Sequence, residues 1–411
     1  MFIASVVLAL LFYSGAVSVR DRHPFVSLAE ESGIVRIEGE ISSNPVRTRF
    51  SGSSYMASLR AVRAFTNSGS FSAGGEVTLF VPDWLVESYY PGKTYSAAAG
   101  NGTGGFLVES GAVVSFDVRP AGKSRMRSAF IVTGGRQLGW AGNFFTERFF
   151  RFRALCRLQF KRLMYAWGNA GGLLLALLSG SREYTDRQVS DGFRDAGLAH
   201  ILALSGMHLG LFGSVARFLG RKARGRAFGE AAQLLAVVFF VWFAGLSPSL
   251  FRAFLAALIL YLNSLLRMRR PDGISLVSVC FIIHVLVFPS HIHEAAFMLS
   301  YASLSGIVVL AEFFRRFSPV FLPHRIRLSL SDSLAAQIAS APVALHLFGR
   351  VAPQGVVASL FVSPLVLLFL YIGLFGVIIC VPLPFLSAPI NAIMSGLYFL
   401  IKGLVSFFSM G

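Results

Sequence analysis

The chain has 411 residues, of which 55% are hydrophobic and 14% are charged, and its formal net charge is +17. A soluble domain carries roughly 25% charged residues, so this composition excludes a soluble globular protein and predicts a polytopic α-helical membrane protein. Lys and Arg gather in the cytoplasmic loops of membrane proteins, so the positive charge does not by itself indicate a polyanionic partner.

The N-terminal third is predicted to hold an anchor and a small β domain. Residues 2–19 form one apolar run, so residues 1–20 are expected to be a transmembrane anchor or a signal-like segment. Residues 31–135 contain alternating hydrophobic stretches such as "GIVRIEGEI" and "EVTLFV", separated by Gly-rich turn clusters. This pattern predicts about five or six short strands that form a small β-barrel or sandwich.

Residues 143–198 are predicted to form interfacial helices. Residues 143–165 alternate aromatic and basic side chains at helical spacing, which is typical of an amphipathic helix lying on a membrane surface. The apolar stretch that follows, "GNAGGLLLALLSG", has 13 residues, whereas a spanning helix needs about 20. We therefore expect this stretch to be a re-entrant or surface-lying element.

Residues 199–411 are predicted to form a membrane domain of about eight transmembrane helices. Three of the connecting loops carry eleven Lys or Arg residues in all, and the three alternate loops carry one. The positive-inside rule places the basic loops in the cytoplasm and residues 31–135 on the outer side. The basic helix at 143–165 then also lies outside, unless "GNAGGLLLALLSG" crosses the membrane. The predicted spans are 199–219, 230–247, 249–266, 274–289, 295–314, 330–348, 355–380 and 388–409.

The first predicted span carries polar residues in "GLAHILALSGMHLGLF", residues 197–212. His200 and His208 need partners or water inside a membrane, Ser205 and His208 share one face of a regular helix, and Gly206 permits close packing or a local break. These residues are predicted to line a polar path or to hydrogen-bond neighbouring helices. An intramembrane hydrolase with Ser205 as nucleophile and a histidine base is an alternative, although the sequence places no carboxylate nearby to orient that base.

Two further polar clusters occur in later spans. In "GLSPSLFRAFLAA", residues 245–257, Pro248 suits a helix start, and Ser249 and Arg252 share one face. Arg252 would attract phosphate if it faced inward and would snorkel to head groups if it faced lipid. In residues 331–350, Gln337 and Pro342 stand among small residues, which predicts close helix packing and a kink at the proline.

No metal site, cofactor site or nucleotide-hydrolysing motif is predicted. The "SHIH" stretch at 290–293 has no nearby Asp or Cys, and the three cysteines form no C-x-x-C pair. The chain also has no G-x-x-x-x-G-K-[ST] motif, so we expect any driving motor to be a separate protein.

The clusters together resemble the ComEC family, the inner-membrane channels of natural competence that admit transforming DNA. The most specific stretch is the family's A-G-L-x-H followed by A-x-S-G-x-H, and residues 31–135, with "PGK" at 91–93, are similar to the OB-like domain that precedes the channel. The four stretches that carry the resemblance are "FRDAGLAHILALSGMHLGLF", "GLSPSLFRAF", "AAFMLSYASLSGIVVL" and "SLAAQIASAPVALHLFGRVAPQGVVASLFVSPLV".

The resemblance implies a multi-pass inner-membrane channel, residues 199–411, that imports single-stranded DNA, with an OB-like domain on the outer side. An OB-like groove stacks bases on aromatic rings and follows the backbone with basic side chains, for which Tyr55, Arg60, Arg63 and Phe65 are suited unless they form an ordinary solvated strand. The residues expected to line the channel or carry its signature are His200, Ser205, Gly206, His208, Ser249, Arg252, Ser300, Gln337 and Pro342.

Three positions depart from the family pattern. Ala296 and Met298 stand where the family has Gly and Gln, and Ser359 stands where it has Asn. Because these changes remove polar side chains from the channel lining, two alternative functions remain. The chain could transport another solute, or it could be a divergent family member that conducts nothing. Many relatives end in a metallo-β-lactamase-like nuclease domain with an H-x-H-x-D-H motif, which these residues lack. We therefore expect these residues to have no catalytic activity. We expect the chain to contact membrane lipids, and a DNA receptor, a nuclease and a cytosolic motor to be separate proteins.

Overall fold

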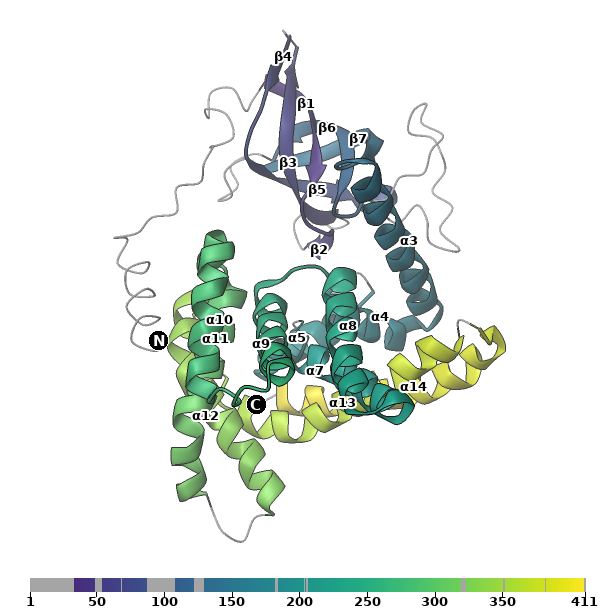
Figure 1. Ribbon diagram of the computed structural model, residues 1–411. Coiled ribbons are helices and arrows are strands. Elements are labelled where there is room, and N and C mark those ends of the chain that lie inside the picture. The colour runs from purple at the N-terminus through teal and green to yellow at the C-terminus, as the bar shows by residue number, and fades with distance from the viewer. Residues whose placement is uncertain are drawn as a thin grey trace. The chain divides into compact units, whose positions relative to one another are not determined.

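The computed structural model describes residues 33–48, 54–67, 69–86, 108–121, 129–181, 184–202, 204, 206–318, 323–349, 352–380 and 382–409. The predicted anchor at 1–20 and the "PGK" turn lie outside these residues. The chain divides into two compact units. One comprises residues 20–172 and 181–184 and contains a β-sheet. The other contains residues 173–180 and 185–411 and consists of helices (Figure 1).

The first unit is built on seven strands joined in one sheet. A four-residue helix, α2 (Asp83–Val86), follows the fifth strand. The strands are β1 (Ile34–Ile41), β2 (Val46–Thr48), β3 (Ser54–Thr66), β4 (Gly69–Ser72), β5 (Glu76–Pro82), β6 (Ala112–Pro120) and β7 (Ala129–Trp140). The sequence pattern predicted this region as strand-rich, and the sheet extends five residues beyond the predicted limit at 135.

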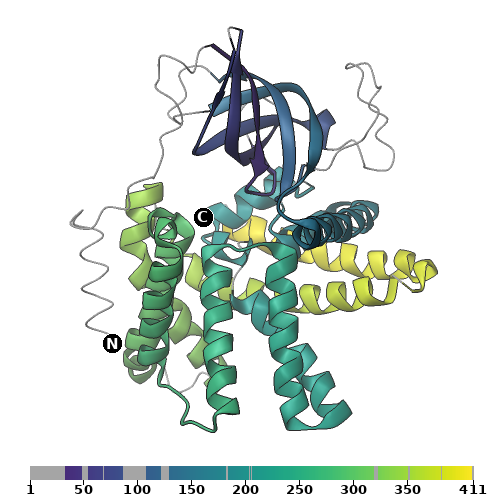
Figure 2. The same cartoon turned by 45° about the horizontal axis from the view of Figure 1, so that its top comes forward.

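The five longer strands pair in a cycle that returns to its start. β1 pairs with β3 and β6, β3 with β5, and β6 with β7, all antiparallel, whereas β5 and β7 pair in parallel. The strands wrap around a shared apolar core (Figure 2). Gly39 lies at an irregularity in the pairing of β1 with β3, and a side chain there would collide with the Arg60 carbonyl. The core includes Ile34, Ile37, Ile41, Leu59, Val114, Phe116 and Phe130.

Two helices follow the sheet. α3 (Phe144–Ala166) has 23 residues and belongs to the sheet unit. α4 (Gly168–Ser179) follows after one residue, Trp167, whose side chain is buried. Residues 173–178 of α4 are all buried, and Leu174 packs against Gly373. The surface-lying alternative for "GNAGGLLLALLSG" is therefore wrong, because its leucines face protein on every side.

The second unit is a bundle of helices, and its composition makes the chain a multi-pass helical membrane protein. Among the described residues, five helices are long and apolar enough to cross a membrane: α8, α9, α11, α13 and the segment 384–409 that contains α14. The helices are α5 (Arg187–Asp195), α6 (Ala199–Leu202), α7 (Gly206–Arg224), α8 (Arg226–Ala244), α9 (Pro248–Leu265), α10 (Gly273–Val287), α11 (Ala295–Phe317), α12 (His324–Phe348), α13 (Gly355–Cys380) and α14 (Ser387–Ser409).

α7 and α8 form a tight antiparallel hairpin. Gly225 alone connects them, with a φ of 85° that favours glycine. The two helices approach closely because Gly220 leaves space for Ala232, with a side chain at Gly220 placed 2.9 Å from the Ala232 Cβ. The residues between the predicted spans 199–219 and 230–247 are thus mostly helical, because glycine at the contact lets both helices continue up to the turn.

Candidate functional site

The chain breaks between α6 and α7, inside the most specific sequence stretch. α6 ends at Leu202 and α7 begins at Gly206. The Leu204 carbonyl accepts a hydrogen bond of 2.5 Å from the Ser249 hydroxyl of α9. The predicted span at 199–219 thus consists of two helices, with a local break of the kind that Gly206 permits. A side chain from another helix takes up a carbonyl that a continuous helix would use itself. Ser205, and hence its predicted shared face with His208, lies outside the described residues.

Arg252 lies one turn beyond Ser249 and faces the same break. α9 begins with Pro248 at its first turn, as predicted. The Arg252 guanidinium is partly buried, and its Nη2 lies 3.6 Å from the point where a side chain on Gly206 would begin. Its Nη1 donates to the Ser300 carbonyl of α11 at a long distance, 3.5 Å.

The charge of Arg252 is not neutralised by an acid within the part of the chain that the structure describes. Its Nε atom has no hydrogen-bond partner there, and no acidic side chain forms an ion pair with it. Tyr301 and Cys280 are the groups that act on it electrostatically. A guanidinium with free donors between helices is suited to bind phosphate oxygens.

Only some of the predicted signature residues lie together in the structure. Gly206, Ser249, Arg252 and the Ser300 carbonyl lie together at the break. His208 is fully buried two residues into α7. His200, in contrast, is exposed on α6.

Gln337 and Pro342 belong to a different place, the packing of α12. The Gln337 amide donates to the Ala352 carbonyl at 3.0 Å, which holds the turn before α13. α12 continues through Pro342 to Phe348. Gly306 of α11 packs directly on Ala335 and Ala339, as expected for small residues in a close helix contact. Gln337 therefore has a structural contact here, and its predicted place along a channel stays a prediction, as does that of Pro342.

The predicted DNA-contacting residues lie on β3, with different exposures. Arg60 and Arg63 are exposed and Phe65 is partly buried, whereas Tyr55 is fully buried in the sheet core. Tyr55 is thus not available to stack on a base, because an even residue spacing along the strand points it inward with Leu59. The prediction for Tyr55 is wrong.

The surface around Arg60 and Arg63 carries both signs of charge. Arg60 lies opposite Glu40 of β1 and Glu76 of β5, and Arg63 lies opposite Glu38. Cross-strand acids of this kind reduce the positive potential of the strand.

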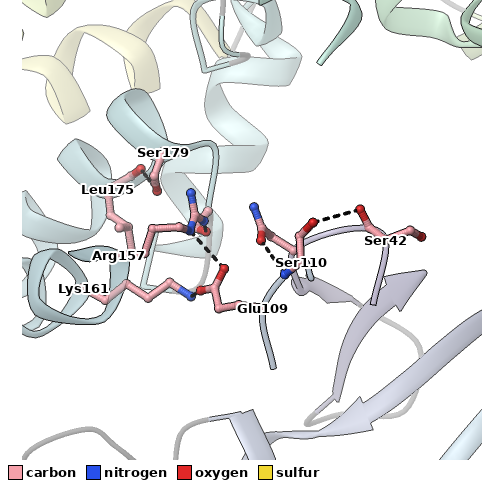
Figure 3. A network of polar contacts seen from close by, with 9 residues as sticks. Ser42, Glu109, Ser110, Arg157, Lys161, Leu175 and Ser179 are labelled. Carbon is pink, nitrogen blue, oxygen red and sulfur yellow. Dashed lines mark hydrogen bonds and ion pairs between the residues drawn. The ribbon is translucent and has the colours of Figure 1, made fainter. Parts of the chain in front are cut away.

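A buried ionic cluster holds α3 to the sheet unit (Figure 3). Glu109 accepts hydrogen bonds from Lys161 Nζ at 2.8 Å and from Arg157 Nε at 3.0 Å. Arg157 also donates to the Ser181 hydroxyl at 3.3 Å. Although burial raises the pKa of Glu109, the charges of Arg157 and Lys161 and the Lys161 hydrogen bond outweigh it and lower that pKa to about 2.

The segment around Glu109 also fixes the ends of two strands. The Gly111 amide donates to the Ile41 carbonyl at 2.8 Å, and the Gly111 carbonyl accepts from Ala141 at 2.8 Å. Gly111 has a φ of 91°, and a side chain there would collide with the Phe150 ring of α3. Only glycine satisfies both conditions at this contact.

The cluster determines which face of α3 is exposed. Arg153, Arg157 and Lys161 are buried, with Arg157 only 2% exposed. The opposite face presents large apolar side chains together with the exposed Arg148 and Arg151. Sequence periodicity identified the two faces but not which of them packs inward. The exposed apolar residues are Phe144, Phe145, Phe149, Phe152 and Leu155.

A model of the competence protein family matches residues 177–410, which is more than half of the chain. The chain belongs to the competence protein family. ComE operon protein 3 of Bacillus subtilis (strain 168) is 27% identical over 187 residues, which cover 44% of this chain and 23% of that relative. The alignment thus spans less than a quarter of the relative's length. No solved structure matches the chain.

The competence-family match begins inside α4, so the polar break, Arg252 and the α11–α12 contact all fall within it. The resemblance to the ComEC family is thereby confirmed. Of the three departures from the family pattern, Ser359 still makes a polar contact, a 3.3 Å hydrogen bond to Ser333 of α12. Met298 instead packs into an apolar cluster around Phe251 and Tyr301.

Sequence reasoning missed two groups of polar residues. Glu109 is 48 residues from Arg157, and no spacing rule connects them. His284 was missed because it stands alone in an apolar run, yet it bonds to His291 and Tyr301. The sequence pointed to the group of His284, His291 and Tyr301 only through the "SHIH" stretch, which contains His291.

Proposed function

We propose that the chain forms an inner-membrane channel through which single-stranded DNA enters the cytoplasm during natural competence. The observation that carries the proposal is Arg252, a partly buried cation without an acidic partner in the described bundle, beside a break in the helix at Gly206. DNA carries a charge on every phosphate, so its path needs positive and polar groups that replace water. Membership of the competence protein family supports this assignment.

The break supplies polar main-chain groups to the same path. The first four N–H groups of α7 have no partner within that helix, and Gly206 is its first residue. Non-helical backbone at membrane depth is tolerated where it lines a cavity or is buried in protein. Gly206, Ser249, Arg252 and His208 would then shape a conduit without taking part in a chemical step.

We assign the sheet unit the role of contacting DNA on the outer side of the membrane. The cyclic strand pairing, with one parallel contact between β5 and β7, supports a small OB-like barrel. Arg60, Arg63 and Phe65 would meet the strand, and Tyr55 would not. Because Glu38, Glu40 and Glu76 share this surface, binding should be weak, and because the two arginines contact phosphates it should weaken further as the salt concentration rises.

The exposed face of α3 would rest on the membrane. Its phenylalanines suit the boundary between head groups and acyl chains, and Arg148 and Arg151 suit lipid phosphates. α3 is also separated by only Trp167 from α4, whose last part belongs to the helical unit.

Replacing Phe145, which is 82% exposed, by tryptophan should place the new indole in lipid. The added fluorescence should be quenched by lipids brominated on their acyl chains, in the full chain reconstituted in vesicles. The matched control is Val62→Trp on β3, also at an exposed apolar position, which should not be quenched. Equal quenching of both, or of neither, would contradict the lipid contact.

The channel requires partners that this chain is not proposed to supply. A DNA receptor, a nuclease that yields the single strand, and a cytosolic motor would be separate proteins, and the chain itself would not be an enzyme. Two functions compete with this proposal: transport of another solute, and a family member that conducts nothing. Ala296 and Met298 favour them, because they stand where the family has Gly and Gln.

Uptake of labelled DNA into cells with and without the chain tests the proposal. DNA held at the cell surface and DNA that reaches the cytoplasm are scored separately. We expect deletion to abolish cytoplasmic DNA while surface DNA persists. Normal cytoplasmic uptake in the deletion strain would favour another cargo.

A further inference from the structure

A row of four polar side chains crosses α10, α11 and the turn between them. The Tyr301 hydroxyl lies 3.1 Å from His284 Nδ1, and His284 Nε2 lies 3.0 Å from His291 Nδ1. His291 Nε2 lies 3.7 Å from the Glu294 carboxylate. Each imidazole therefore has one neighbour on each of its ring nitrogens, as a chain of proton donors and acceptors requires.

The row leads from the surface of the bundle into its interior. The Glu294 side chain is 50% exposed and that of His291 is 15% exposed, whereas His284 is fully buried and Tyr301 nearly so. Aromatic rings pack against the two histidines and Tyr301. They come from Phe251, Phe281, Phe288 and Phe297.

The inner end of the row meets the candidate channel site. Tyr301 is adjacent to Ser300, whose carbonyl accepts from Arg252, and its hydroxyl lies within electrostatic range of the Arg252 guanidinium. The other ionisable group facing this end is the Cys280 thiol of α10. The row thus connects the solvent at Glu294 with the vicinity of Arg252.

The two hydrogen bonds, between Tyr301 and His284 and between His284 and His291, can run in either direction, and a proton transfer converts one direction into the other. Glu294 lies 3.7 Å from His291 and must approach it slightly to give up its proton. Inward, His291 Nε2 takes a proton from Glu294, and the proton on His291 Nδ1 passes to His284 Nε2. The proton on His284 Nδ1 then passes to the Tyr301 oxygen, and the Tyr301 hydroxyl gives its own proton to water beside Arg252, while Glu294 takes up a new proton from the solution. Each group gains one proton and loses one, and only the two imidazole tautomers change.

We propose that Glu294, His291, His284 and Tyr301 form a proton relay between the aqueous phase and the Arg252 site. Burying an ionisable residue inside a membrane bundle costs free energy, and such residues commonly mark proton pathways. The four side chains follow one another from an exposed position to a buried one, as the groups of a proton relay do. That the protons serve DNA movement rests on the proposed channel, whereas the passage of protons requires only that water reaches Arg252.

Proton flux through the reconstituted protein tests the relay. The full chain is placed in vesicles that contain a pH-sensitive dye, a potassium gradient with valinomycin supplies the driving potential, and flux is measured with and without an added thymidine oligonucleotide. Tyr301→Phe removes one hydroxyl and keeps the ring that packs on Phe281 and Phe297. The matched control is His293→Gln, a neighbouring histidine that is exposed and outside the row.

We expect flux above that of empty vesicles in at least one of the two conditions, a loss of tenfold or more in Tyr301→Phe and Glu294→Gln, and no change in His293→Gln. Flux that Tyr301→Phe and Glu294→Gln leave intact would overturn the relay, as would no flux from a protein that still binds the oligonucleotide. Flux with the expected variant pattern but without binding or uptake of DNA would uphold the relay and count against the channel.

Discussion

Arg252→Leu should reduce the entry of labelled single-stranded DNA into the cytoplasm by tenfold or more. The guanidinium is the cation beside the Gly206 break, with free donors in the described bundle. Hydrogen bonds to charged groups contribute about 1.5–3 kcal/mol, and about 1.4 kcal/mol corresponds to a factor of ten. Arg252→Lys should retain part of the uptake, because it keeps the charge but loses the planar set of donors.

The control for this experiment is Arg194→Leu, which removes an arginine of the same unit whose side chain is 50% exposed. Both variants must be present in the membrane fraction at the level of the unchanged chain. If Arg252→Leu is inserted normally and takes up DNA within twofold of that chain, Arg252 does not contact the phosphates and the channel path lies elsewhere.

Glu109→Gln should destabilise the sheet unit by about 3–5 kcal/mol, since removal of one partner from a buried ionic group leaves uncompensated charge in protein. Here Arg157 and Lys161 would lose the carboxylate that each contacts at 3.0 Å or less. The purified full chain is heated, and cleavage of the sheet unit by a protease at each temperature reports its unfolding. The shift of this transition measures the loss of stability. The exposed pair of Arg36 and Asp117 provides the control, and Asp117→Asn should cost about 1 kcal/mol or less.

The same carboxylate predicts a loss of stability in acid. Its pKa is lowered from 4.5 to about 2 in the folded chain, so its contribution is complete above the unfolded value and disappears as the pH falls from about 4.5 towards 2. Glu109→Gln should lack this part of the acid transition. An identical pH dependence in both proteins would show that the carboxylate is not held in this cluster.

The positions of the helices were predictable, because an apolar run of nearly twenty residues has few alternatives in a membrane chain. The break between Leu202 and Gly206 was predictable only as one of two options at Gly206, since hydropathy does not register that the Ser249 hydroxyl takes up the Leu204 carbonyl. For α3, the spacing of aromatic and basic side chains predicted an amphipathic helix, and the structure buries Arg153, Arg157 and Lys161 on one face of it. That this face turns inward depends on Glu109, a single acid in a distant turn.

The candidate site was predictable where its residues lie on one helix turn. Ser249 and Arg252 are three residues apart, and both face the break as their spacing indicates. The contact of Gln337 was not predictable, because an amide in an apolar helix serves a conduit or a turn equally well, and the sequence does not show its 3.0 Å hydrogen bond to the Ala352 carbonyl. His284 and His291 meet through a turn whose geometry no residue pattern specifies.

The α7–α8 hairpin limits the ways in which the bundle can move. α8 has 19 residues, or about 28 Å at 1.5 Å per residue, which nearly equals the hydrocarbon thickness of about 30 Å. The turn carries exposed Arg221, Lys222, Arg224 and Arg226. A piston stroke of one helical turn would draw these charges into lipid, at about 2.5–3.5 kcal/mol for each. The hairpin is therefore pinned along the membrane normal, and a gate in this bundle must open by rotation or tilt.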